Sequence, residues 1–462
     1  MSAASTDAGS AIDYAPDGSL TIEAVTASAL VERFGTPTYV MSDAQLRSNY
    51  RRLEAAFTSC YPSVRVAYGI KAHNGAAVCQ VLAEEGAGAE CFGIGEMTVA
   101  QRAGVPVDRI WINGSDKTDA ELAESVRRSY TVNVDNPDEL SRIGRIADAQ
   151  DAVAKVNLRV KLPLRELRDV RLKDYRYVPP EVLLAEWARD HKFGMTADEA
   201  LECVHVGLES ASIDLCGLHH HLRGQTSRAE YFGAFTRELI EFAQWLRRET
   251  GWTPREVDLG GGFSYGRAEG YGPAGRDRDV PSLDAYAAEM GGALKESCEA
   301  YDMPLPTMVI EPGRMLVASA GVLLTRVGTV KRHPQGRTWV HVDASINHLI
   351  RVYTGNWYYH IVPINRTDPG ATTEVVDVVG QLCDAADVLA HDRALPPLMR
   401  GDVLAVLDVG AYAESAASNF NTQQRPLAAM VRGAEAAVTT ERESVDAMLS
   451  RQRIPAWRDE TC

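Results

Sequence analysis

The chain has 462 residues, of which 45% are hydrophobic and 24% charged, a composition typical of a globular protein of two or three domains. Its formal net charge of -15 argues against a nucleic-acid-binding surface, since no block of lysines and arginines offsets it locally. The eight cysteines are scattered without a C-x-x-C pair, which favours reduced thiols in the cytoplasm over a disulfide framework or a zinc site.

The N-terminal residues 1–20 are small and polar and predict a flexible tail. They lack the charged and apolar regions of a signal peptide, and no later segment approaches the roughly 18 apolar residues of a membrane span. Residues 38–41 predict a short strand, and the pattern Ser42-Asp43-Ala44-Gln45 predicts a capped helix start. We therefore expect no membrane segment, and regular structure from about residue 21.

Short β-rich runs then alternate with amphipathic helical runs. Eight strands are predicted, at residues 64–71, 87–92, 109–113, 131–135, 155–160, 213–219, 256–260 and 307–311. Eight strand–helix units within about 250 residues predict an α/β fold of the (β/α)8 type, a TIM-like barrel over residues 45–318.

From about residue 319 the pattern changes to alternating strands with few helices, predicted at residues 322–327, 339–342, 373–379 and 403–406. They predict a second, mostly antiparallel β domain made of residues 319–462 together with 21–44. The segment 161–190 is long, rich in arginine and lysine, and interrupts the fifth strand–helix unit. It is interpreted as a surface insertion or an active-site flap.

Lys71 ends the first predicted barrel strand and is followed at once by polar turn residues. The mouth of a barrel is where an amine that forms a Schiff base would be placed, because strand ends there are held rigidly. An ε-amine partly buried among apolar neighbours is expected to lose its proton easily. Taken alone, an ordinary lysine at a strand end explains the pattern better, but later segments change this interpretation.

Two of these segments follow the seventh and eighth predicted strands. Gly260-Gly261-Gly262 would let backbone N–H groups surround a phosphate, with the dipole of a following helix, and barrels commonly bind phosphate there. Glu311-Pro312-Gly313-Arg314 places an acid and a guanidinium on one turn. They would hold a heteroaromatic nitrogen and an anion, or simply pair with each other.

His219-His220-His221 ends the sixth predicted strand, and alternation puts His219 and His221 on one face. We expect no metal here, because no carboxylate or third ligand lies at a diagnostic spacing. An imidazole stacked on an aromatic cofactor is the favoured role. Cys383-Asp384 follows a strand of the second domain. Cys383 is interpreted either as a small buried hydrophobe or as a proton donor. Tyr412 lies on a glycine-preceded turn.

In this order, the segments resemble the fold-type III pyridoxal-phosphate decarboxylases, the diaminopimelate and ornithine decarboxylase family. Residues 68–74 resemble Y-A-x-K-A-N, and residues 217–225 resemble G-x-H-x-H-[IV]-G-S-Q. The motifs G-G-G, E-P-G-R, C-[ED]-S and G-A-Y are matched by Gly260–Gly262, Glu311–Arg314, Cys383-Asp384 and Gly410–Tyr412. The similarity runs from about Gly35 to Glu443.

The resemblance implies decarboxylation of an amino acid with pyridoxal 5'-phosphate, in an alanine racemase-like barrel-plus-sheet architecture and a homodimer with shared active sites. It implies that Lys71 holds the cofactor covalently, that Glu311 pairs with the ring nitrogen and that Cys383 reprotonates the carbanion. It places further residues around the cofactor (His221, Gly260, Gly261, Gly262, Arg314 and Tyr412) and at the distal end of the substrate (Arg314, Arg351 and Asp384).

Departures from the family bear on the substrate. Arg223 and the basic segment 161–190 add positive charge, Gly355 stands where diaminopimelate decarboxylases carry tyrosine, and Asp384 where they carry glutamate. These changes favour a larger or more anionic amino acid or conjugate from specialised metabolism. The alternative is a true meso-diaminopimelate decarboxylase of lysine biosynthesis, in which Trp357 or Tyr358 replaces the lost contact.

Two other functions compete. An amino-acid racemase of the same architecture is disfavoured, because alanine racemases lack both G-G-G after the seventh strand and E-P-G-R after the eighth. A catalytically silent regulatory homologue is disfavoured by the joint presence of Lys71, Glu311 and Cys383.

Overall fold

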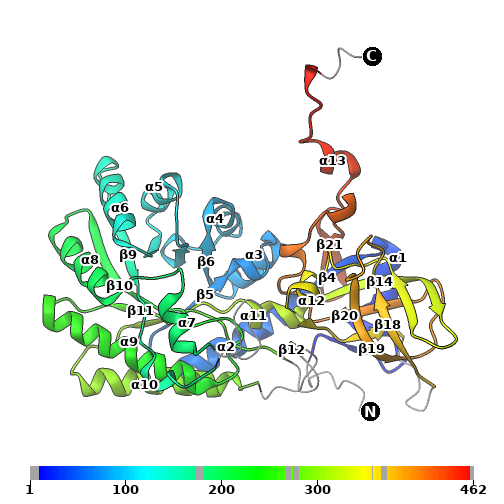
Figure 1. Cartoon of the computed structure of the whole chain (residues 1–462), viewed down its shortest axis with the longest axis horizontal. Coiled ribbons are helices and arrows are strands. Elements are labelled where there is room, and N and C mark those ends of the chain that lie inside the picture. The colour runs from blue at the N-terminus through cyan, green and yellow to red at the C-terminus, as the bar shows by residue number, and fades with distance from the viewer. Residues whose placement is uncertain are drawn as a thin grey trace.

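The computed structural model describes residues 10–171, 182–266, 272–273, 280–355, 357–365 and 372–457. Figure 1 shows a barrel ringed by helices beside a separate sheet domain, with the chain crossing between them more than once. Among the described helices, none combines the length and apolar character needed to cross a membrane.

Eight parallel strands close into a barrel, which confirms the predicted fold class. Their bounds agree with the predicted strands to within two residues: β5 (Val64–Gly69), β6 (Gly88–Phe92), β7 (Ile110–Asn113), β8 (Thr131–Val134), β9 (Ala154–Arg159), β10 (Ile213–His219), β11 (Glu256–Asp258) and β13 (Thr307–Ile310). The barrel closes where β13 pairs with β5, with Val309 opposite Arg65. The carboxyl ends of all eight strands therefore meet at one mouth.

Helices cover the outside of the barrel: α2 (Asp43–Cys60), α3 (Ala76–Glu84), α4 (Gly93–Arg102), α5 (Asp119–Arg128), α6 (Pro137–Ala149), α8 (Ala197–Glu209), α9 (Ala229–Thr250) and α10 (Leu283–Ala300). The Ser42 hydroxyl caps α2 by accepting from the Gln45 N–H at 3.1 Å, as predicted. The apolar face of α2 packs into the barrel core through Leu46, Tyr50, Leu53 and Phe57.

The second domain is built on a nine-stranded sheet. It comprises β4 (Thr38–Ser42), β14 (Gly321–Arg332), β15 (Thr338–Val342), β17 (Ile361–Pro363), β18 (Glu374–Val379), β19 (Val388–Leu395), β20 (Val403–Leu407), β21 (Leu427–Arg432) and β22 (Glu435–Thr440). The long strand β14 runs antiparallel to β4, β15 and β20, and among the described strands of this sheet only the pairs β15–β18 and β4–β21 are parallel. The sheet is thus mostly antiparallel, as predicted.

The N-terminal segment differs from the prediction of a flexible tail up to residue 20. Residues 1–9 lie outside the described part, but β1 (Ile12–Tyr14) pairs with β2 (Leu20–Ile22). Ile12 and Leu20 are each only 1% exposed and pack into a cluster with Val40 and Val322 of the sheet domain. The prediction is wrong from residue 12 onward because a few apolar side chains within polar sequence are enough to bind this short hairpin to the sheet.

The basic segment 161–190 is anchored at both ends. Its residues 172–181 lie outside the described part, while Leu162, Leu164, Leu167 and Leu184 are buried in the barrel core. The short helix α7 (Leu184–Asp190) closes the segment. Arg165 pairs with Glu241 at 2.5 Å and Arg189 with Asp190 at 2.8 Å, so acids offset part of the expected positive charge.

Candidate active site

Lys71 lies at the mouth of the barrel, as predicted. Strand β5 ends at Gly69, and Lys71 follows in the 3-10 turn Ile70–Ala72. Its side chain is 41% exposed, and its Nζ forms an ion pair with the fully buried carboxylate of Glu90 on β6. The tight approach depends on Gly69, since a Cβ there would lie 3.6 Å from Nζ and 3.1 Å from Glu90 Oε2.

The protonation state of Lys71 differs from the prediction. Desolvation alone lowers the pKa of the amine, but the surrounding negative charge, Glu90 foremost, outweighs it and raises the pKa above its ordinary value. In the protein without cofactor, Lys71 is therefore a protonated, ion-paired amine. The expectation that it loses its proton easily is wrong for this state, because it took account of apolar neighbours and missed the carboxylate on the next strand.

Asparagines connect three buried acids inside the barrel. Asn113 Nδ2 donates to Glu90 Oε1 at 2.9 Å and to Glu311 Oε1 at 2.6 Å. Asn133 Nδ2 donates to Asn113 Oδ1 at 3.0 Å and to Asp258 Oδ2 at 3.2 Å. The side chains come from the carboxyl ends of different strands, and the amide bonds fix the orientation of each acid.

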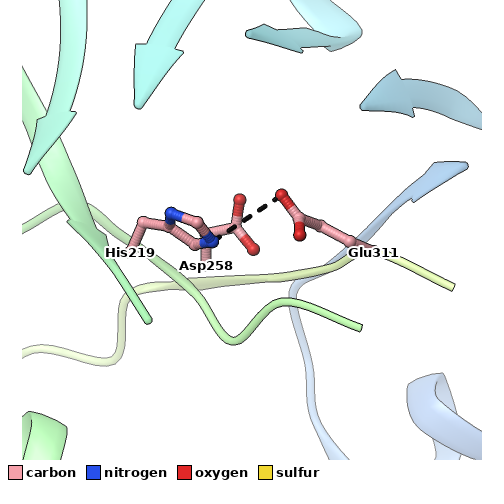
Figure 2. Close-up of side chains that lie close together, drawn as sticks. All are labelled: His219, Asp258 and Glu311. Atoms are coloured by element: carbon pink, nitrogen blue, oxygen red, sulfur yellow. Dashed lines mark ion pairs between the residues drawn. The ribbon is translucent and has the colours of Figure 1, made fainter. Parts of the chain in front are cut away.

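Figure 2 shows His219, Asp258 and Glu311 facing one another in this interior. His219 Nε2 lies 3.8 Å from Glu311 Oε1, and neither ring nitrogen has a hydrogen-bond partner within the described residues. Burial lowers the pKa of His219, so its imidazole is neutral. Burial and the charge of Glu90 raise the pKa of Glu311 to about 7, and burial and Glu311 raise that of Asp258.

The cluster of His219, Asp258 and Glu311 must be compared with the prediction that no metal binds near the histidines, because side chains of these types can coordinate a metal ion. One ligand atom from each of the three residues lies within 4.8 Å of the others. The carboxylates that the sequence spacing did not show come from β11 and from the end of β13. The raised pKa values of Asp258 and Glu311 favour protonated acids, which would balance charge here without a cation, and the absence of a metal stays a prediction.

Of the three glycines after β11, Gly260 and Gly261 lie against His221, and Gly262 lies against the Arg223 backbone. The Gly261 N–H donates to His221 Nδ1 at 3.0 Å, and burial lowers the pKa of this imidazole, which is therefore neutral. Gly260 and Gly262 have φ values of 65° and 90°, where a side chain is strained. A Cβ on Gly261 would overlap the Glu311 carbonyl oxygen. The predicted helix does not follow directly, since the next described helix, α10, begins at Leu283.

Aromatic rings hold two arginines where the barrel meets the sheet domain. The Arg314 guanidinium lies 4.1 Å from the centroid of the Trp357 ring and 4.7 Å from that of Tyr412. Arg351 also lies 4.7 Å from the Tyr412 centroid. The Tyr412 N–H donates to the Ala72 carbonyl at 2.7 Å, which ties this ring to the turn that carries Lys71. Predicted residues from both domains therefore meet at one place.

Cys383 and Asp384 do not join this site within one chain. Cys383 is exposed on the loop after β18, and its N–H donates to Asn421 Oδ1 at 2.7 Å. Asp384 Oδ1 accepts from the Ala386 N–H at 2.9 Å, and Asp384 lines an open cavity of about 340 Å³ beside Trp339. Within the described ranges, no hydrogen bond or ion pair connects Cys383 or Asp384 to Lys71.

Sequence reasoning missed Glu90, Asn113 and Asp258. All three lie near the carboxyl ends of predicted barrel strands, the same signal that identified Lys71. Applying that signal to every polar residue at a strand end would have found them. Their mutual contacts, however, depend on the order and closure of the barrel.

The comparisons with known proteins agree with this geometry. A family model for the pyridoxal-binding domain of pyridoxal-dependent decarboxylases matches residues 44–318. The diaminopimelate decarboxylases of Methanothermobacter thermautotrophicus and Methanocaldococcus jannaschii are 32% and 31% identical to this chain over 96% and 95% of its length, covering 98% and 96% of theirs. The crystal structure of the M. jannaschii enzyme matches with a TM-score of 0.86 at 30% identity, over 96% of this chain and 98% of that one.

A barrel with a strand-end lysine, a glycine cradle and a buried acid, joined to a β domain, defines a fold-type III pyridoxal-phosphate enzyme. The chain belongs to the pyridoxal-dependent decarboxylase family. It is an amino-acid decarboxylase, a carboxy-lyase, and its cofactor is pyridoxal 5'-phosphate.

The residues present fit that cofactor. A side chain at Gly261 would fill the cradle, and no other residue type accommodates the φ values of Gly260 and Gly262 as easily. The Lys71 amine and the Glu311 carboxylate, which Asn113 orients, are groups that could react with an aldehyde and pair with a ring nitrogen, respectively.

Proposed function

We propose that this enzyme decarboxylates meso-diaminopimelate to lysine. The observation that carries the proposal is the pair of arginines around Tyr412, Arg314 and Arg351. A substrate that loses one carboxylate and keeps a second needs cations to hold the remaining one. Arginine suits this task because its planar guanidinium matches a carboxylate.

The relatives support the same substrate. The curated proteins compared above are named diaminopimelate decarboxylases, and the M. jannaschii enzyme has also been solved in complex with L-lysine, the product of this reaction. The preference for a specialised substrate, drawn from the departures in sequence, is weaker. Part of the positive charge that suggested it is neutralised, as in the pair Arg165–Glu241.

The cofactor supplies an electron sink for the electrons left by departing CO2. In this proposal Lys71 would bind the cofactor and would give up its proton to the network around Glu90. Glu311 would keep the ring nitrogen protonated, and the neutral imidazole of His221 would contact the ring. Gly260–Gly262 and Tyr412 would bind the phosphate.

Cys383 and Asp384 enter through a second copy of the chain. Cys383 is exposed, and within one chain it lies outside the set of residues tied to Lys71. We therefore include in the proposal a two-fold dimer in which each copy lends this loop to the other's site. The Cys383 thiol would return a proton to the substrate carbon, and Asp384 would contact the substrate's distal end.

A CO2-release screen over meso-diaminopimelate, lysine, ornithine, arginine and larger carboxylated amino-acid conjugates tests the substrate. We expect kcat/KM on meso-diaminopimelate to be on the order of 10⁴ M⁻¹s⁻¹ or more and to exceed the others. Better turnover of a larger conjugate would restore the specialised substrate. A cofactor-loaded protein that releases no CO2 from any of them would support the silent regulatory homologue.

A further inference from the structure

Two buried polar atoms at the junction of the domains have no hydrogen-bond partner among the described residues. They are Arg314 Nη1 and the hydroxyl oxygen of Tyr359. Tyr359 is 0% exposed and Arg314 is 8% exposed, so water does not readily replace the missing partners. Leaving such groups unsatisfied costs free energy, which makes their presence here a sign of a ligand.

The two atoms belong to one neighbourhood. Tyr359 follows the short strand β16 (Trp357–Tyr358), and burial alternates along this extended run, with Trp357 and Tyr359 inside and Tyr358 between them less buried. Trp357 and Tyr359 therefore share a face. Since the Trp357 ring holds the Arg314 guanidinium at 4.1 Å, Tyr359 lies on the side of that cation.

The electrostatics agree with this placement. Burial raises the pKa of Tyr359 to about 12, while the charges of Arg314 and Arg351 act on its hydroxyl in the opposite direction. The hydroxyl thus keeps its proton at neutral pH. Asp408, the acid whose charge also reaches it, accepts a hydrogen bond from the Tyr265 hydroxyl at 2.9 Å.

The chemistry of the missing partner follows from the donors. A guanidinium N–H can only donate, and a protonated phenol beside two cations donates best. The partner must therefore bring acceptor oxygens and negative charge. Two anions would meet this need in a decarboxylase of this family: the cofactor phosphate and a remote carboxylate of the substrate.

We propose that Tyr359 donates its hydroxyl to the remote carboxylate of the substrate, beside Arg314 and Arg351, and so selects amino acids with a second carboxylate. The inference rests on the proposed function and names a residue that determines its specificity. It also accounts for Gly355, where a tyrosine is lost, since a hydroxyl four positions later takes its place.

The two residues expected from sequence to replace this contact serve otherwise. The Trp357 ring packs against the Arg314 guanidinium, so its side chain is already held in that contact. The Arg393 guanidinium lies 3.5 Å from the centroid of the Tyr358 ring, so this ring is engaged by a different cation. Tyr358 is therefore the matched control for Tyr359.

The experiment compares Tyr359→Phe with Tyr358→Phe in cofactor-loaded enzyme, on meso-diaminopimelate and on L-lysine, which lacks the second carboxylate. For Tyr359→Phe we expect KM on diaminopimelate to rise about ten- to a hundredfold, with kcat, cofactor retention and residual activity on lysine unchanged. Tyr358→Phe should match the wild type. Since the Tyr359 hydroxyl has no hydrogen-bond partner among the described residues, its removal should not lower Tm.

Three outcomes for Tyr359→Phe overturn the inference. An unchanged KM removes Tyr359 from the substrate site. Weaker cofactor retention, with equal losses on both substrates, assigns the hydroxyl to the cofactor phosphate, and a lower Tm with equal losses assigns it a structural role. If wild-type enzyme ignores diaminopimelate, the proposed function fails by itself. Tyr359 is then tested by measuring how strongly pimelate, a simple dicarboxylate, inhibits turnover of the preferred substrate. Equal inhibition of the wild type and of Tyr359→Phe would overturn the inference.

Discussion

Glu90 holds Lys71 in an ion pair although 19 residues separate them in sequence. A carboxylate beside the amine stabilises the ammonium form, which cannot attack an aldehyde. The same carboxylate raises the pKa of Glu311 across the barrel. A single buried charge thus acts on both groups that the sequence identified as central.

We expect the rate of cofactor capture by cofactor-free enzyme to rise with pH, roughly tenfold per pH unit between about 7 and 9, because only the unprotonated amine reacts. In Glu90→Gln the pairing charge is lost while desolvation remains, so the pKa of Lys71 falls. At pH 7 the variant should then capture cofactor faster than the wild type does, and its rate should reach a plateau at a lower pH than the wild-type rate. Stopped-flow absorbance across pH measures this, and identical pH profiles would mean that Glu90 does not control the amine.

Variants of Lys71 and Glu311 should show that cofactor attachment and catalytic rate depend on different residues. We expect Lys71→Ala to lose the visible absorption band and activity, because the substitution removes the amine that the proposal assigns to the cofactor. Glu311→Gln should keep the cofactor but lose a factor on the order of 10² or more in kcat, since the ring nitrogen loses its charged partner. Borohydride labelling of another lysine, or wild-type turnover of Glu311→Gln, would contradict these assignments.

At the scale of elements, the end of β11 packs so closely against the end of β13 that there is no space for a side chain at Gly261. We expect Gly261→Ala to weaken cofactor retention and lower Tm, because the new Cβ overlaps the Glu311 carbonyl and displaces the strand end that carries this acid. Gly292→Ala, in the middle of α10 with open space around it, is the control. It should raise stability by up to about 1 kcal/mol. Equal behaviour of the two variants in thermal melts would rule out the steric argument.

The elements show which features the sequence could predict. Apolar strands with polar ends located the barrel and placed Lys71, the glycines and Glu311, because these depend on local pattern. The hydrogen bonds that join Asn113 to Glu90 and Glu311 depend on which strands become neighbours across a closed barrel. The packing of Ile12 against Val322 likewise joins distant segments, which is why a tail was expected there.

At the scale of the whole molecule, one chain holds two parts of the proposed site that do not meet. The arginine junction lies between the domains, whereas Cys383 is exposed on a loop of the sheet domain. The proposed two-fold dimer would resolve this arrangement, because an isologous interface would bring the loop of each copy to the other's Lys71. Sharing of this kind makes activity depend on association.

Co-expression of Lys71→Ala and Cys383→Ala chains with different affinity tags tests the shared site. Each variant alone should be nearly inactive, because every site lacks one essential group. A heterodimer purified through both tags carries one site with both groups intact and one with neither, so it should recover about half of the wild-type activity per dimer. A random mixture should recover about a quarter, since only about half of its dimers are mixed.

If Lys71 and Cys383 instead served the same chain's site, no heterodimer would hold an intact pair, and doubly tagged dimers confirmed by mass would stay inactive. The position of Cys383 favours recovery, because a proton donor this exposed in a single chain needs a second surface to exclude water around it.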